Sequence, residues 1–194
     1  MTIVCLGWGS LIWRQEKLPV IEPWHDDGPK LPVEFARQSQ GGQITLVIKD
    51  GLPASRVFWA ALDVANLNDA REVLRVREKI QASSAEQNVA HWSRNDGSSR
   101  RSETGTIEMW AAQKPEIEAV VWTALPPKFD KENGRMPTEQ EVVAYLQTLN
   151  GQQRDDAEKY VRCAPPRIRT PYRIAIERAL DWIPLALESC CSSE

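Results

Sequence analysis

Histidine is scarce in this 194-residue sequence, and its cysteines lack the spacing of a metal site. The two histidines are His25 and His91, and no two of the four cysteines form a Cys-x-x-Cys pair. Because zinc sites use Cys and His ligands at short characteristic spacings, we expect no metal. A nucleophile pair of Cys5 and His25 is geometrically possible, but nothing in their spacing favours it, and we interpret Cys5 as an inert strand residue.

Signals for disulfides and for export are also missing. Cys190 and Cys191 are neighbours near the end of the sequence, and the other two cysteines are Cys5 and Cys163. Such a set is more typical of reduced thiols in the cytoplasm than of a disulfide framework. Residues 1–7 contain no basic segment ahead of an apolar core and no small-residue cleavage site. We therefore expect a cytoplasmic protein.

Long apolar stretches and basic clusters are absent. No apolar run reaches the roughly 18 residues of a membrane-spanning helix. The formal net charge is −3, and no basic run is longer than the pair Arg100 and Arg101. Phosphate binding needs a clustered positive surface. The sequence therefore indicates neither a nucleic-acid partner nor a membrane partner, and it leaves the oligomeric state open.

The composition that remains is that of an ordinary globular protein, with 42% apolar and 26% charged residues. A chain of this length can bury roughly 70% of the surface that it exposes when unfolded. No internal repeat and no boundary between two cores is visible. We expect residues 1–194 to form a single domain.

Six segments have strand character. Their residues are apolar, β-branched or alternating, and turn sequences such as Gly41-Gly42 and Asp50-Gly51 bound some of them. The predicted segments are residues 3–6, 33–36, 44–48, 56–62, 106–110 and 119–123. Interrupted once by a helix, they predict an α+β fold built on a small mixed sheet or barrel.

The interrupting helix is predicted over residues 68–80. On a helical wheel, Glu78 lies about 20° from Leu67, at the edge of the apolar face. Helix statistics alone favour a solvated boundary position for this carboxylate, paired with Arg71 or Lys79.

The remaining part of the chain is a polar insertion followed by helices. Residues 81–104 contain Val89 and Trp92 as their only large apolar residues, which is typical of lids, insertions and disordered segments. Further on, a capping box between Thr138 and Glu141 begins a helix. Additional helices are expected over residues 155–163 and from about Tyr172, the last one limited or bent by Pro184.

The first predicted strand ends in a loop bracketed by glycines, Gly7-Trp8-Gly9-Ser10-Leu11. This loop lacks the third glycine of a dinucleotide fingerprint and the Gly-Lys pair of a phosphate-binding loop, and its serine is not within Gly-x-Ser-x-Gly. Glycines allow backbone N–H groups to approach a ligand closely and to converge on an anion. A simple turn explains the loop about as well.

Two motifs together resemble those of a known family. Trp8-Gly9-Ser10-Leu11, directly after the first strand, is similar to the Tyr-Gly-Ser-Leu/Asn signature of the γ-glutamylcyclotransferases. Leu74-x-x-Arg77-Glu78 is similar to the segment that carries the catalytic glutamate of that family. The resemblance covers most of the chain, with residues 81–103 as the poor match. Further positions that follow the order of the family are Arg37, Ser39, Gly41, Thr45, Leu46, Val47, Gly51, Pro137, Thr138, Gly151 and Tyr160.

The resemblance implies a small mixed β-barrel of about six strands flanked by helices, and a cofactor-free enzyme of glutathione metabolism, a lyase or transferase. Its small-molecule partner would be a γ-glutamyl peptide or amine, from which 5-oxoproline is released. The α-amine of the substrate attacks its own γ-carbonyl, so the nucleophile is already tethered. Glu78 would act as general acid and base, provided that burial raises its pKa. The N–H groups of Gly9, Ser10 and Leu11 would hold the developing oxyanion.

The sequence also departs from the family pattern. Trp8 replaces the usual tyrosine, so we expect the hydrogen bond of the phenol to be lost and stacking or shape to remain. Arg94, Arg100 and Arg101 of the insertion could contact an anionic leaving group, although solvated charges are the commoner role. Tyr160 could reach the site, but we expect it to pack in the core. The alternative function is a non-catalytic small-molecule binding or interaction module on the same fold.

Overall fold

The computed structural model describes residues 2–190, except for the side chains of residues 187 and 188. The chain divides into two compact units. The first unit contains residues 2–7, 15–31 and 56–125. The second unit contains residues 8–14, 32–55 and 126–190. Two short strands, β3 (Lys30–Leu31) and β6 (Ser55–Arg56), lie where the chain passes from one unit to the other. That residues 1–194 form a single domain stays a prediction.

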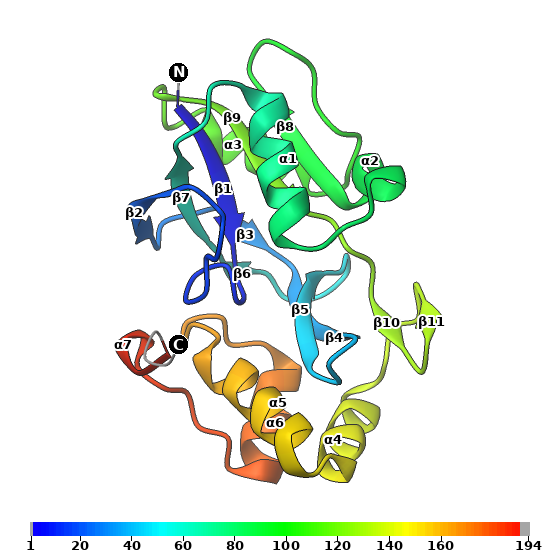
Figure 1. Cartoon of the computed structure of the whole chain (residues 1–194). Coiled ribbons are helices and arrows are strands. Elements are labelled where there is room, and N and C mark those ends of the chain that lie inside the picture. Colours follow the sequence, from blue (N-terminus) through cyan, green and yellow to red (C-terminus); the bar gives the residue numbers. More distant parts are fainter. Residues whose placement is uncertain (1, 191–194) are drawn as a thin grey trace. The chain divides into compact units, whose positions relative to one another are not determined.

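The first unit is built on a five-stranded sheet with β1 at its centre (Figure 1). β1 runs antiparallel to β7 and parallel to β9, and β8 runs antiparallel to β9. Residues 3–7 of β1 are all buried, as expected for an apolar run in a strand that is covered on both faces. In sheet order the strands are β2 (Val20–His25), β7 (Phe58–Leu62), β1 (Thr2–Gly7), β9 (Ile117–Thr123) and β8 (Val89–Ser93).

Helices pack against this sheet. α1 contacts β1, β8 and β9, while α3 contacts β8 and β9. The N-cap of α1 is Asn66, whose side chain accepts a hydrogen bond from the N–H of Asp69. The helical segments of the first unit are α1 (Leu67–Arg77), η1 (Ala82–Ser84), α2 (Ala85–Asn88) and α3 (Thr104–Ala111).

The predicted strand over residues 106–110 is wrong, because this segment forms helix α3. Its buried residues are Ile107, Trp110 and Ala111, which follow the i, i+3, i+4 spacing of a helix face. The residues of the other face, such as Met109, are exposed. In so short a segment, the β-branched and aromatic residues concealed the helical period.

The polar insertion is more ordered than its composition indicated, since it contains η1, α2 and the edge strand β8. The hydroxyls of Ser98 and Ser99, from the loop that follows β8, accept hydrogen bonds from the N–H groups of Ser93 and His91 in that strand. Further along, the carboxylate of Glu103 is buried and accepts a hydrogen bond from Trp122 Nε1 at 2.9 Å.

The second unit contains a four-stranded sheet in which β5 is an edge strand. β4 pairs antiparallel with β5, with Phe35 opposite Leu46, and parallel with β10. In sheet order the strands are β11 (Glu132–Asn133), β10 (Lys128–Phe129), β4 (Val33–Gln38) and β5 (Ile44–Ile48).

The C-terminal part of the second unit is helical, as predicted. The capping box between Thr138 and Glu141 is confirmed, with both reciprocal hydrogen bonds present at the start of α4. α5 packs on β5, α6 packs on β4, and α4 packs on α6. The helices are α4 (Glu139–Thr148), α5 (Gly151–Cys163), α6 (Pro171–Leu180) and α7 (Leu187–Cys190).

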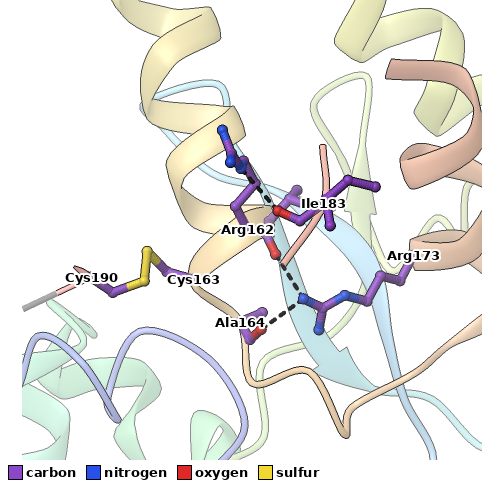
Figure 2. Close-up of a disulfide and its surroundings, with 7 residues drawn as sticks. Arg162, Cys163, Ala164, Arg173, Ile183 and Cys190 are labelled. Atoms are coloured by element: carbon purple, nitrogen blue, oxygen red, sulfur yellow. Dashed lines mark hydrogen bonds between the residues drawn. A yellow bond between two sulfur atoms is a disulfide. The ribbon is translucent and has the colours of Figure 1, made fainter. Parts of the chain in front are cut away.

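The end of α5 is held by a buried arginine and by a disulfide (Figure 2). The Arg173 guanidinium donates to carbonyl oxygens at this helix end, including Ala164 O at 2.8 Å and Pro165 O at 2.7 Å. It therefore satisfies acceptors that a helix leaves unpaired at its C-terminus. A disulfide joins Cys163 to Cys190, so the expectation of reduced thiols is wrong for this pair. Cys5 is a free, buried cysteine, and Cys191 lies outside the described residues.

The predicted α+β class is confirmed. The described strands form sheets of five, four and two strands, and no closed barrel is found among residues 2–190. In the same part of the chain, no helix combines the length and the apolar composition needed to cross a membrane.

Candidate functional site

The predicted loop, Trp8-Gly9-Ser10-Leu11, begins a helical turn in the second unit. The N–H of Ile12 donates to Gly9 O at 3.1 Å, and the N–H of Arg14 donates to Ser10 O at 2.8 Å. A helical turn directs the amides of its first residues away from the turn. That the amides of Gly9, Ser10 and Leu11 hold an oxyanion stays a prediction.

The Trp8 side chain anchors this loop to the edge of the four-stranded sheet. Its indole is buried, and its Nε1 donates a hydrogen bond to Leu46 O at 3.1 Å. Leu46 lies in the middle of the edge strand β5. The expectation that only stacking or shape would remain at this position is therefore wrong, because the indole N–H makes a hydrogen bond of its own. The side chain of Leu11 is buried as well, so these two side chains support the loop.

Tyr160 of α5 lies against the same loop. The N–H of Leu46 donates to Tyr160 Oη at 3.2 Å, and a Cβ atom placed on Gly9 would lie only 2.5 Å from that oxygen. The Tyr160 ring makes edge contacts with Trp13 and Phe35, with ring centroids 5.5 Å and 6.4 Å away. The predicted packing role of Tyr160 is therefore only part of its role, since its hydroxyl reaches Gly9.

Glu78 lies in the first unit, at the C-cap of α1. The helix ends at Arg77, earlier than the predicted residue 80. Two hydrogen bonds close it, from Lys79 N–H to Val76 O at 3.1 Å and from Ile80 N–H to Arg75 O at 3.0 Å. Lys79 adopts a left-handed conformation with φ of 54°. This is the pattern of a Schellman motif, and it fixes the backbone from which the Glu78 side chain projects.

The Glu78 carboxylate is largely buried and is paired with a neighbouring arginine. Its side chain is 19% exposed, and Oε1 lies 2.8 Å from Nη1 of Arg77, whose side chain is 6% exposed. The solvated boundary position with Arg71 as partner is therefore wrong, because Arg71 pairs with Glu86 instead. Arg77 stands within the sequence motif, but its pairing with Glu78 was not predicted. Its place next to Glu78 at a helix end was the available signal.

Glu78 also acts on the thiol of Cys5 in β1. Burial raises the pKa of Cys5 strongly, the negative charge of Glu78 raises it further, and Arg77 lowers it. The charged pair therefore lies close to β1, which α1 contacts. The interpretation of Cys5 as an inert strand residue agrees with this burial. β1 ends at Gly7 and is followed directly by Trp8, the first residue of the predicted loop.

Other candidate residues have structural roles. His25 stacks on Trp59, with ring centroids 4.2 Å apart. The imidazole of His25 thus has Trp59 as a neighbour, whereas a nucleophile pair would need Cys5 next to it. Arg94 donates to the carbonyl oxygens of Ala111 and Ile117 at 3.2 Å and 3.0 Å. Arg101 donates to Gln87 O. The side chain of Arg100 is exposed.

A metal site is not formed by the residues that the structure describes. No three of their His, Cys, Asp and Glu side chains lie together in a group that could hold an ion.

No protein-family model matches the chain, and no curated protein matches it.

Proposed function

We propose that this protein is a γ-glutamylcyclotransferase-like enzyme that releases 5-oxoproline from a γ-glutamyl peptide or amine. One observation carries the proposal. A largely buried carboxylate, Glu78, lies at the C-cap of α1, which packs on β1, the strand that leads directly into the Trp8–Leu11 turn. The small mixed barrel expected of that family, the absence of a cofactor and a cytoplasmic location belong to the same proposal.

The reaction needs one base and one acid in succession. Glu78 removes a proton from the α-ammonium group of the substrate, and the freed amine attacks the γ-carbonyl carbon. A new C–N bond closes the five-membered ring, and the bond to the leaving nitrogen breaks. Glu78 returns its proton to that nitrogen, and the ring nitrogen loses the second proton of the attacking amine, which ends on the released amine. The products are therefore 5-oxoproline and a protonated amine or amino compound. The tethered nucleophile contributes the proximity that would otherwise require a second bound reactant.

The turn supplies the second requirement, which is stabilisation of the negative oxygen. Amides of Gly9, Ser10 and Leu11 lie at the beginning of the turn, and one well-placed donor of this kind is worth about 3 kcal/mol. Trp8 and Tyr160 hold the turn through the two backbone groups of Leu46. A turn held on two sides costs little reorganisation when charge develops on the substrate.

The experiment that tests the proposal measures 5-oxoproline after incubation with glutathione and a panel of γ-glutamyl dipeptides and amines. The E78Q variant should lose activity by at least about a hundredfold, while its melting temperature stays close to that of the wild type. The matched control is E72Q, which removes an exposed carboxylate of the same helix that is paired with Arg75.

Equal turnover by E78Q and the wild type would refute the role of Glu78. Shifts in melting temperature caused by these compounds, without any product, would support the non-catalytic binding module instead.

A further inference from the structure

The ion pair at the end of α1 is largely buried, unlike the neighbouring pair on the same helix. Arg77 and Glu78 have side-chain exposures of 6% and 19%. The neighbouring pair on the same helix, Arg75 with Glu72, has exposures of 21% and 58%. Exposed pairs contribute little, whereas a charge that is buried without its partner is costly. The first pair is thus the one whose disruption should have a large effect.

The backbone keeps these two side chains adjacent. Arg77 is the last residue of α1 and Glu78 is its C-cap, with the N–H of Glu78 donating to Leu74 O at 3.0 Å. The closing hydrogen bonds of Lys79 and Ile80 hold the next turn. Since consecutive side chains on a continuing helix diverge by about 100°, the change of backbone direction at Glu78 allows its carboxylate to meet the guanidinium.

Nη1 of Arg77 is 2.8 Å from Oε1 of Glu78. A charge-assisted hydrogen bond of this length restrains the carboxylate and favours its ionised form. An ionised and restrained carboxylate is what a base needs before it receives a proton from an ammonium group.

Other titratable groups near the pair come from the strands that pack on α1. Cys5 of β1 interacts with both Arg77 and Glu78. β8 carries His91, which interacts with Arg71 and Glu86. β9 carries a single charged residue, Glu118.

We propose that Arg77 is a positioning residue, which holds the Glu78 carboxylate through its Oε1 oxygen while that carboxylate carries the proton between the two nitrogens of the substrate. This inference rests on the proposed function. Arg77 does not touch the reacting atoms in this scheme, and it acts through the orientation and charge of Glu78. Displacement of a catalytic group by about 1 Å can cost a hundredfold in rate.

The test compares the pH dependence of 5-oxoproline release by the wild type, R77Q, R77K and the control R75Q. In R77Q, kcat at neutral pH should fall about ten- to a hundredfold, with a smaller change in KM. The acid limb of kcat/KM should move to higher pH, because a carboxylate without its neighbouring guanidinium holds its proton more tightly. R77K retains the charge, so its acid limb should stay near that of the wild type while kcat is partly restored. R75Q should behave as the wild type.

Two failures can be told apart. A wild-type protein that forms no 5-oxoproline from any compound of the panel overturns the proposed function, and the role of Arg77 with it. If the wild type is active and R77Q has the same kcat and the same acid limb of kcat/KM, only the positioning role of Arg77 is overturned. If R77Q is too unstable to assay, the R77K variant tests the positioning role instead. A kcat of R77K equal to that of the wild type at every pH would overturn this role.

Discussion

At the scale of single residues, Gly9 and Tyr160 depend on each other. Tyr160 Oη accepts the N–H of Leu46, and its ring contacts Trp13 and Phe35, so the phenol has little freedom to move. The backbone of Gly9 comes so close that a Cβ atom there would meet the phenol oxygen at 2.5 Å. Glycine is therefore required at this position by the close approach of the tyrosine rather than by backbone conformation.

This dependence predicts the outcome of a double substitution. G9A should lower both 5-oxoproline release and the melting temperature, because the methyl group displaces the turn or the phenol. Y160F removes the oxygen atom in conflict, and the next Tyr160 atom lies 3.5 Å from the Cβ position. G9A/Y160F should therefore be more stable than the sum of the two single variants, with a coupling of about 1 kcal/mol in a double-mutant cycle of urea unfolding. Additive effects would contradict the close approach.

The residues of the candidate site could be predicted only in part. The wheel placed Glu78 at the edge of an apolar face, and the structure finds it largely buried. The Schellman stop could not be predicted, because it has Lys79 in place of the usual glycine. The roles of Trp8 and Tyr160 depend on Leu46, a backbone partner on a strand distant in sequence, and no local pattern encodes such a contact.

At the scale of elements, the end of α5 is the most strongly constrained helix end described above. The Arg173 guanidinium occupies its carbonyl oxygens, and Cys163 in its last turn is bonded to Cys190. Between the two cysteines, the N–H of Leu185 donates to Arg162 O at 2.8 Å. These contacts attach the C-terminal segment to α5.

The disulfide predicts a redox-dependent stability. The bond closes a loop with a sequence separation of 27 residues, and a loop of this size is expected to stabilise the folded chain by about 3 kcal/mol. Urea unfolding of the wild type with and without dithiothreitol should differ by about that amount. C190S should resemble the reduced wild type and should not respond to dithiothreitol. An oxidised wild type no more stable than C190S would contradict the prediction.

Elements with a clear period were predicted correctly, and those without one were not. The helix beginning at Thr138 was evident from its reciprocal capping pair. Residues 44–48 were correctly predicted as a strand, but the prediction of a central strand buried on both faces is wrong, because β5 lies at the edge of its sheet. α3 was mistaken for a strand because its helical face spans few residues. β8 was missed because a polar insertion surrounds it, and its pairing with β9 is a long-range contact.

At the scale of the whole molecule, folding shifts the pKa values of two carboxyl groups, Asp27 and Glu34, in opposite directions. Hydrogen bonds from Lys114 and Trp59, at 2.7 Å each, lower the pKa of Asp27 in the first unit. Burial raises the pKa of Glu34 in the second unit, although the hydroxyl of Thr170 opposes the shift. A carboxyl group whose pKa is lower in the folded than in the unfolded state stabilises the folded protein at pH values above its unfolded-state pKa. A carboxyl group whose pKa is raised by folding makes the folded protein less stable as the pH rises.

The contribution of Asp27 predicts how D27N changes with pH. The ionised carboxylate stabilises the folded protein at neutral pH, and this stabilisation is lost as the pH falls below about 4. The wild type should therefore exceed D27N in unfolding free energy at pH 7 by less than about 1 kcal/mol, since the carboxylate is more than half exposed. The difference should shrink toward pH 3. Urea unfolding at both pH values measures it, and a difference that grows on acidification would refute the assignment.

The serine hydroxyls beside β8 have a consequence for the behaviour of the protein at high concentration. An edge strand normally offers its N–H groups to any extended chain, which is how aggregation by intermolecular strand pairing begins. Here Ser98 and Ser99 already occupy two of these N–H groups. An incoming chain would have to displace both hydroxyls before it could pair, so the loop shields an apolar strand from fibril formation.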